Sequence, residues 1–306
     1  MSLSESSPPP CRVCGEGETR FLCTTPNEHS RQETLRHFRC KKCGSVFVGN
    51  VIDSEELGQA YATLDEDTYY QEIESENRKK MATAVGHLQD LLSRSARILD
   101  IGTGNGLFVE RLYEAGFTDV SGHEIPGADL SRIATIAGAL YQDMDYSSVP
   151  SGHFDAVTAL DVAEHVPDPE FLMRTCGRVL KPGGLFYCHT PVVTRTDRLI
   201  HLVQRLPGLS RVGSAWQRGR TSVFHLQNYT PQALTMLLDR AGFRDVQVDI
   251  RNELSWPVTR YVRVYLLEKQ GLPGFLAPIL GPLFYPVLAT DLLNGNKAIV
   301  GARKAG

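Results

Sequence analysis

The chain has 306 residues, of which 42% are hydrophobic and 22% are charged, and its formal net charge is −3. This length suits one large domain, or a domain with a small module, and the charge argues against a strongly basic nucleic-acid binder. Five of the seven cysteines lie in the first 43 residues, which predicts a small cysteine-dependent module ahead of a conventional domain.

The first ten residues, MSLSESSPPP, have neither the basic stretch nor the apolar stretch of a secretory signal. We expect residues 1–10 to form a disordered tail and the protein to be cytoplasmic. In that compartment, thiols stay reduced or bind metal ions rather than forming disulfides.

Two CxxC pairs, Cys11 with Cys14 and Cys40 with Cys43, are separated by 25 residues. Each CxxC turn can present two thiolates to one ion, and two such turns complete a tetrahedral zinc site. Residues 11–50 are therefore predicted to form a zinc ribbon holding a structural Zn²⁺. Two disulfides, or inert thiols, are the alternative. Cys23 is left over and is expected to be a small buried hydrophobe.

Residues 51–96 are expected to form a linker and N-terminal helices that could act as a lid. From residue 97, apolar runs alternate with helical patterns, which predicts a doubly wound, mostly parallel α/β sheet of Rossmann-like type over 97–306. The predicted strands are 97–101, 119–125, 139–141, 153–160, 184–190, 244–250 and 296–304. The predicted helices are one that ends at Ala115, then 127–138, 167–180 and 230–242, the last capped by Thr230.

An arginine-rich insertion at 191–229 breaks this alternation, with six arginines against one acid. Guanidinium groups suit an acceptor that bears carboxylate, phosphate or a nucleotide group. Arg218, Arg220 and His225 are therefore our candidate substrate-binding residues for a small, anionic molecule. A solvated lid helix is the alternative.

Residues 271–290 carry no charge, but four prolines and three glycines interrupt them. We therefore expect neither a continuous helix nor a transmembrane span there. The segment could line a lipophilic pocket, touch a membrane face at the interface or form the surface of a homodimer.

A glycine-rich loop, LDIGTGNG (99–106), follows the first predicted strand. Its glycine spacing differs from the GxGxxG of dinucleotide-binding loops. Asp100, at the strand's end, suits a ligand with a positive amine better than a pyrophosphate. The loop therefore indicates a nucleotide-like cofactor of another kind.

Two further acids follow the next two strands. Glu124 can accept hydrogen bonds from the hydroxyls of a ribose, or it is a surface acid beside a turn. Asp143 can accept from the exocyclic amine of an adenine, or it is the N-cap of a short helix over 144–149.

Four segments together resemble the class I S-adenosylmethionine-dependent methyltransferases: LDIGTGNG (99–106), VSGHEI (120–125), FDAVTALDVAEHVPDP (154–169) and LKPGGLFYCHTP (180–191). The resemblance implies a seven-stranded sheet with S-adenosylmethionine lying across the carboxyl ends of the strands. The cofactor-binding residues that it implies are Asp100, Gly102, Thr103, Gly104, Gly106, Glu124, Asp143, Met144, Asp161 and Tyr70. Tyr70 precedes the first sheet strand, in a segment that closes over the donor in other members; packing is its alternative role.

Further motifs narrow the resemblance. The cysteine module together with HLQNYTPQALTMLLDRAGF (225–243) is similar to small-molecule methyltransferases of bacterial glycan and natural-product pathways. The run AEHVPDP is similar to the ubiquinone O-methyltransferases, which carry an acid-x-x-Glu-His cluster for a divalent cation. Here the cluster reads Asp161, Glu164 and His165, with Asp where the pattern usually has Glu.

We therefore expect a methyltransferase acting on a hydroxyl oxygen of a small molecule. His165, His225 and Asp161 are the catalytic candidates; His165 could be a base, a ligand of a catalytic divalent cation or a residue that shapes its loop. The alternative is a ribosomal-RNA base methyltransferase whose zinc ribbon binds RNA. Residues 1–50 carry seven bases and five acids, which is a weak footprint for phosphates.

Overall fold

The computed structural model describes residues 8–26, 34–50, 66–203, 206, 225–253, 257–268 and 273–306. The chain forms two compact units that alternate along the sequence. The first comprises Met1–Ile52, Pro191–Leu234 and Ile250–Ala298, and the second Asp53–Thr190, Thr235–Asp249 and Ile299–Gly306. The predicted insertion thus groups with the cysteine module. Most of the predicted tail, the linker at 51–65, Arg218 and Arg220 lie outside the described residues.

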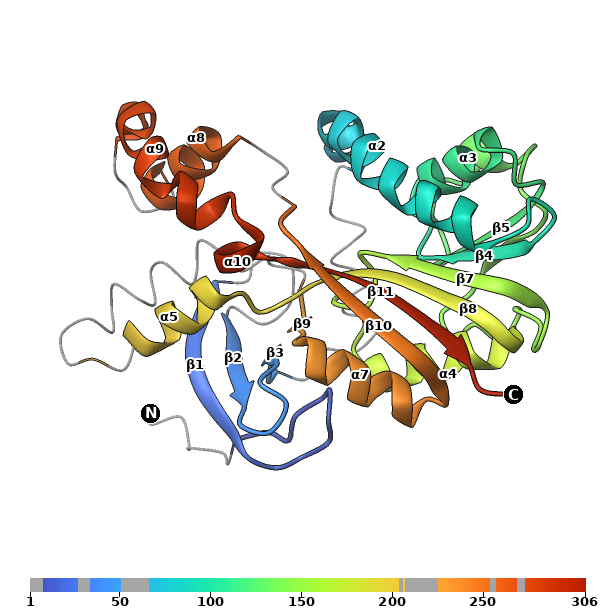
Figure 1. The fold of residues 1–306 in the computed structure, drawn as a ribbon, viewed down its shortest axis with the longest axis horizontal. Coiled ribbons are helices and arrows are strands. Elements are labelled where there is room, and N and C mark those ends of the chain that lie inside the picture. The colour runs from blue at the N-terminus through green and yellow to red at the C-terminus, as the bar shows by residue number, and fades with distance from the viewer. Residues whose placement is uncertain are drawn as a thin grey trace. The chain divides into compact units, whose positions relative to one another are not determined.

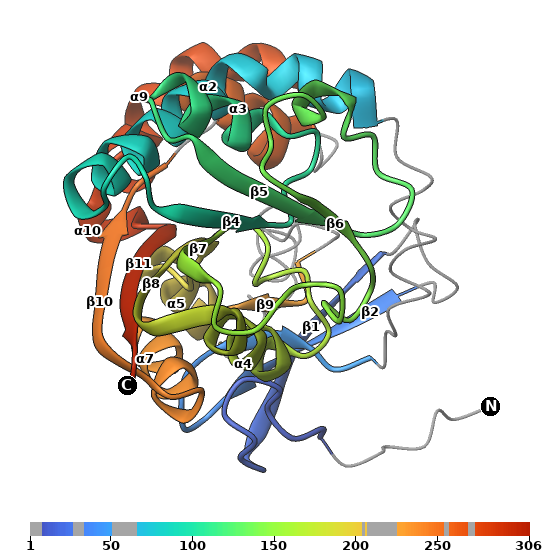
Figure 2. The ribbon, with the colours of Figure 1, turned by 90° about the vertical axis from the view of Figure 1, so that its right-hand side faces the viewer.

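A seven-stranded sheet forms the core of the second unit, and it confirms the predicted fold class. Its strands are β4 (Arg97–Ile101), β5 (Asp119–Glu124), β6 (Leu140–Gln142), β7 (Phe154–Leu160), β8 (Leu180–Pro191), β10 (Phe243–Arg251) and β11 (Lys297–Lys304). Their order in the sheet is β10-β11-β8-β7-β4-β5-β6 (Figure 1, with β6 labelled in Figure 2). The pairings from β6 through β5, β4 and β7 to β8 are all parallel.

The path of the chain through this sheet fixes where a ligand can bind. The chain runs outward from β4 through β5 to β6, and then crosses to β7 on the other side of β4. The carboxyl ends of β4 and β7 therefore form a topological switch point, where open α/β sheets bind their ligands.

Helices cover both faces of the sheet. Helices α2 (Glu66–Leu91) and α3 (Leu107–Glu114) lie on one face and α4 (Pro169–Val179) lies on the other (Figure 2). Helix α4 begins where Asp168 accepts a hydrogen bond from Phe171 N at 3.0 Å. The buried core beneath α2 and α3 includes Ala84, Leu88, Ile98, Phe108, Leu112, Phe117, Val120 and Ala156.

The predicted helix at 127–138 is wrong. Only the 3₁₀ turn η1 (Ser131–Ile133) forms there. Gly127 has a left-handed φ of +94°, and the Asp129 side chain accepts from Ser131 N at 2.9 Å in a local turn. The left-handed glycine does not fit an α-helix. The Asp129 side-chain bond favours a loop as well, because it competes with the helical hydrogen bonds of the backbone.

The cysteine module of the first unit is a four-stranded antiparallel sheet of order β1-β2-β3-β9. Its strands are β1 (Thr19–Pro26), β2 (Thr34–Cys40), β3 (Val46–Val48) and β9 (Gln227–Asn228). Strand β9 pairs with β3 through Val46 and Phe47. The module therefore includes a strand from the end of the predicted insertion.

The remaining helices of the first unit are α5 (Arg195–Val203), α8 (Val258–Tyr261), the π-helical η2 (Val262–Leu267), the 3₁₀ turn η4 (Gly274–Leu276), α9 (Ala277–Leu288) and α10 (Asp291–Asn294). Helix α7 (Pro231–Arg240) begins in the first unit and ends in the second. Within the described residues, no helix is both long and apolar enough to cross a membrane.

Helix α9 occupies only the middle of the uncharged segment 271–290, but it contains two of the prolines in its interior. It continues through Pro282 and Pro286. Together with Pro278, these prolines lie four residues apart and all are exposed. The carbonyl groups that lose an N–H partner to them therefore lie on the solvent side of the helix, where water can satisfy them.

Candidate functional site

Asp100 lies at the carboxyl end of β4, at the topological switch point. Its side chain is buried, and Oδ1 accepts a hydrogen bond from Thr158 Oγ1 at 2.6 Å. Burial raises the pKa of Asp100 to about 7, since desolvation disfavours the charged form. A positively charged ligand group beside it would favour the carboxylate again, which fits the predicted amine contact.

The glycine loop turns sharply after β4. Gly102, Gly104 and Gly106 have φ values of +68°, +57° and +81°, in the left-handed region that favours glycine. A Cβ at Gly102 would clash with Val162, and one at Gly106 would clash with Ile133. These two glycines are thus required by the packing of the loop as well as by its backbone angles.

Hydrogen bonds hold this loop against β5. The amides of Gly102 and Thr103 both donate to His123 O, at 2.9 and 3.1 Å. Glu124 accepts from Gly104 N and from Ile125 N, each at 2.8 Å. The Glu124 carboxylate is therefore held at the end of β5 beside the loop, and its contact with a ribose stays a prediction.

Asp143 follows β6 and is held by three hydrogen bonds. Oδ1 lies 3.2 Å from His123 Nε2, and Oδ2 accepts from Ser148 N at 3.0 Å and from the Ser148 hydroxyl. Desolvation opposes ionisation, but the bonds from Ser148 and His123 outweigh it and lower the pKa of Asp143 to about 2. Asp143 therefore anchors the turn that follows it, although no helix forms over 144–149 for it to cap. Met144 is largely exposed beside it.

The supporting residues of Asp143 were not found from the sequence. His123 is buried under Asp143, and its ring centroid lies 4.4 Å from that of Tyr146. The only local signal was the position of His123 immediately before Glu124 in a predicted strand, which by itself indicates no role.

The predicted acidic cluster follows β7. Glu164 is buried, its Oε2 accepts from Thr190 Oγ1 at 3.0 Å, and its Oε1 lies 4.0 Å from His165 Nε2. Asp161 has a left-handed φ of +57°, its amide donates to His189 O at 3.0 Å, and its side chain is exposed. Glu164 and His165 thus face each other, and both could contribute ligand atoms to a cation. Asp161 does not belong to the group of closely spaced ligand atoms that contains them.

The remaining site candidates belong to other segments of the chain. His225 precedes β9 in the first unit. Tyr70 lies in α2, but its side chain is outside the described part of the chain, as are Arg218 and Arg220. The roles assigned to these four residues stay predictions.

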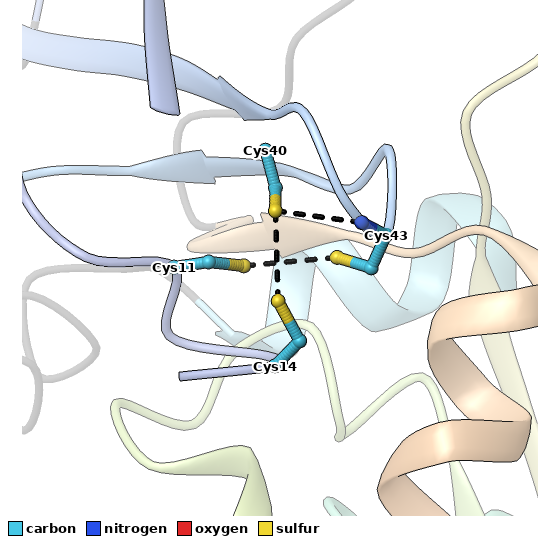
Figure 3. A group of neighbouring side chains, drawn as sticks. All are labelled: Cys11, Cys14, Cys40 and Cys43. Atoms are coloured by element: carbon cyan, nitrogen blue, oxygen red, sulfur yellow. Dashed lines mark hydrogen bonds between the residues drawn. The ribbon is translucent and has the colours of Figure 1, made fainter. Parts of the chain in front are cut away.

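The four cysteines of the two CxxC turns point toward one another in Figure 3. The Sγ atoms of Cys11 and Cys43 are 3.7 Å apart, and those of Cys14 and Cys40 are 3.5 Å apart. Thiolates around a tetrahedral zinc, with Zn–S bonds of about 2.3 Å, lie roughly 3.8 Å apart. The cluster therefore fits the predicted zinc ion, with all four ligands buried.

The turns that present these thiols have the same geometry. Gly15 and Gly44 follow the second cysteine of each pair with φ values of +73° and +75°, and their amides donate to Cys11 O and Cys40 O. All seven cysteines are described, and none forms a disulfide. Cys23 is buried in β1 outside the cluster, as expected.

The cluster itself shows how a thiolate is stabilised there. A hydrogen bond from the Cys11 thiol lowers the pKa of Cys43, whereas burial raises the pKa of Cys14. A bound divalent cation would take the place of the protons and satisfy all four sulfurs.

Thr230 connects the cysteine cluster to α7. Its Oγ1 accepts from Ala233 N at 3.1 Å, which is the predicted cap, and donates to Cys43 O at 2.6 Å. The second CxxC turn and the start of α7 are thus held by one hydroxyl group.

Comparisons with known proteins agree with this geometry. A family model described as a methyltransferase domain matches residues 73–248, more than half of the chain. The ubiquinone biosynthesis O-methyltransferase of Idiomarina loihiensis is 23% identical over 227 residues, covering 65% of this chain and 83% of that protein. Its counterpart in Xanthomonas oryzae pv. oryzae is 35% identical over 104 residues, but the match covers only 31% of this chain and 43% of that protein.

Solved structures show the same fold. The complex between the Haloferax volcanii Trm112 methyltransferase activator and a methyltransferase matches with a TM-score of 0.52 and 14% identity. The match covers 78% of this chain and 96% of that chain. At this identity, the likeness concerns the fold alone.

Proposed function

The chain belongs to the methyltransferase domain family and is an S-adenosylmethionine-dependent methyltransferase, and from this premise we propose that it methylates a hydroxyl oxygen of a small-molecule acceptor. The reaction is an in-line displacement at the methyl carbon. The carbon–sulfur bond of the donor breaks as the new carbon–oxygen bond forms, and the acceptor hydroxyl loses its proton.

The observation that carries this proposal is the row of three carboxylates at the ends of neighbouring strands. Asp100 near the end of β4, Glu124 at the end of β5 and Asp143 after β6 are each held by hydrogen bonds from other residues of the second unit. They match the three polar parts of S-adenosylmethionine in order: the amine, the ribose and the adenine. Fixed groups of this kind position the donor, and positioning supplies much of the catalysis of a displacement.

Transfer to oxygen, rather than to nitrogen or carbon, is supported by the relatives named as O-methyltransferases. A hydroxyl acceptor benefits from a base, and His165 supplies one beside the buried Glu164. In this scheme, an imidazole nitrogen of His165 takes the hydroxyl proton, and the Glu164 carboxylate stabilises the imidazolium that results. A divalent cation held by Glu164 and His165 would instead lower the pKa of the hydroxyl.

Action on RNA is less well supported. The second CxxC turn carries Lys41 and Lys42, but these side chains pair with Glu18 at 3.1 Å and Glu16 at 2.6 Å. Such pairing reduces the positive charge that a phosphate backbone would need. We propose a small molecule of glycan, quinone or natural-product type, with an anionic group for the arginine-rich insertion.

The test measures donor binding and transfer separately. S-adenosylmethionine binding is followed by calorimetry, and transfer of a labelled methyl group to a catechol-type aromatic acid is followed by mass spectrometry. His165→Gln is expected to lower kcat by about 10²–10⁴ and to leave the donor Kd unchanged. His153→Gln, which changes a histidine packed on Phe154 instead, is the matched control.

Each outcome has a clear meaning. Failure to bind S-adenosylmethionine would contradict the donor site. Methyl transfer to ribosomal RNA but not to the aromatic acid would favour the RNA alternative. An unchanged kcat in His165→Gln would remove His165 from the chemistry.

A further inference from the structure

The outer face of η4 and α9 is apolar throughout. Phe275, Ile279, Leu283 and Tyr285 are exposed by 77%, 69%, 72% and 60%. The prolines between them are exposed as well, and residues 271–290 contain no charged residue. The solvent side of this helix therefore offers almost no polar side-chain group except the hydroxyl of Tyr285.

The opposite face of α9 is already occupied. Ala277 and Leu288 pack with Val258, Val262 and Leu267 of α8 and η2 in a small core. A surface helix ordinarily has an apolar stripe on the inside and polar residues on the outside. An exposed apolar face of this extent marks a surface that another phase or molecule covers.

We propose that this face, which we call the α9 apolar face (Phe275, Ile279, Leu283 and Tyr285 with the intervening prolines), lies in the interface of a membrane rich in anionic phospholipids. The proposal holds whichever acceptor the enzyme methylates, so it goes beyond the proposed function. Large apolar and aromatic side chains next to basic ones are typical of helices that lie in the boundary between headgroups and acyl chains.

The net positive charge around α9 favours binding to negatively charged lipids. Residues 257–290 carry Arg260, Arg263 and Lys269 against Glu268 alone, a net charge of +2 in a chain whose total is −3. Arg263 lies beside the α9 apolar face, because a Cβ at Gly274, next to Phe275, would lie 3.1 Å from its side chain, and it pairs there with Glu268 at 2.7 Å. Arg260 and Lys269 then supply the net positive charge of the segment. Basic groups at the edge of an inserted apolar face attract anionic headgroups.

Two other occupants fit less well. Helix α9 has 12 residues and a length of about 18 Å, which is short of the roughly 30 Å hydrocarbon layer of a bilayer, so it can lie in a membrane but not cross it. A standard stable dimer interface takes roughly 20–30 residues from each partner, many more than this face supplies, so a second copy of the chain is the less favoured occupant.

The test is flotation of the full-length protein with lipid vesicles. Vesicles of phosphatidylcholine alone are compared with vesicles that also contain phosphatidylglycerol, at low and high salt. We expect binding to the anionic vesicles that weakens with salt. The triple variant Phe275→Ser/Ile279→Ser/Leu283→Ser should lower the partition coefficient at least about 100-fold, and Arg260→Gln/Arg263→Gln about fivefold for each charge removed.

The matched control replaces two exposed hydrophobic residues of the second unit, Leu91 and Tyr113, by serine; its partition should equal that of the wild type. Circular dichroism and the affinity for S-adenosylmethionine show whether the variants fold. Absence of wild-type flotation, or equal flotation of the triple variant, would overturn the proposal. So would a dimer in analytical ultracentrifugation that the triple variant converts to a monomer while vesicles are not bound.

Discussion

Asp100 is a carboxyl group in a buried position, where ionisation is unfavourable. Its pKa is raised to about 7, so near neutral pH the unliganded protein holds a mixture of the acid and the carboxylate. In the predicted contact, the donor's ammonium group needs the Asp100 carboxylate as its partner. Donor binding and deprotonation of Asp100 should therefore be coupled.

This coupling gives a pH dependence with a definite sign. Between about pH 6 and about pH 8, the affinity for S-adenosylmethionine should rise roughly tenfold, because the ionised fraction of Asp100 rises with pH through its pKa. Calorimetry in buffers of different ionisation enthalpy should detect proton release on binding in the lower part of this range.

Asp100→Asn is the control for this prediction, since it retains the shape of the side chain and removes its titration. We expect this variant to bind the donor more weakly. We also expect the proton release that comes from Asp100 to disappear. Proton release equal to that of the wild type would show that another group titrates.

Among single residues, the sequence predicted the positions of the three carboxylates but not the residues that hydrogen-bond to them. Asp100, Glu124 and Asp143 each end or follow a strand, so their positions follow from the order of elements. His123 and Ser148, which hold Asp143, are brought to it by tertiary folding. No spacing in the sequence distinguishes them from ordinary strand and loop residues.

Among the elements, strands and helices with a clear apolar period were predicted nearly to the residue. The differences arose where a local turn, or a pairing partner distant in the sequence, determines the backbone conformation. The segment 127–138 became a loop because Gly127 and Asp129 favour turns. Helix α9, which occupies only part of the uncharged segment 271–290, includes prolines that share one exposed face. Strand β9 is two residues long and exists through its pairing with β3, which no local pattern reveals.

Thr230 provides a test at the scale of one helix end. Thr230→Val retains the shape of the side chain but removes both the cap of α7 and the bond to Cys43 O. We expect a loss of about 1–2 kcal/mol in the free energy of unfolding, measured by denaturant titration. Thr230→Ser retains the hydroxyl group and should lose clearly less; equal losses in the two variants would point to the methyl group, which packs near Gly44.

For the whole molecule, the two compact units divide the chemistry between them. The predicted donor residues Asp100, Glu124 and Asp143 belong to the second unit, whereas the four cysteines and the arginine-rich insertion belong to the first. Because β9 completes the sheet of the cysteine module, the predicted zinc ion stabilises a sheet that includes the end of the insertion. The N-terminal module is thus part of the unit predicted to bind the acceptor rather than a separate attachment.

Removal of zinc should therefore affect the two substrates differently. The purified protein is expected to contain about one zinc per chain, the number that a closed four-cysteine site holds. Chelation, or Cys43→Ser, should lower the thermal stability of the first unit and raise the acceptor KM, because the sheet that carries β9 loses its metal support. The donor Kd, measured by calorimetry, should change less than about threefold.

Cys23→Ser is the matched control, since Cys23 is buried in the same sheet but lies outside the cluster. A parallel loss of donor affinity on chelation would show instead that the metal supports the molecule as a single cooperative unit.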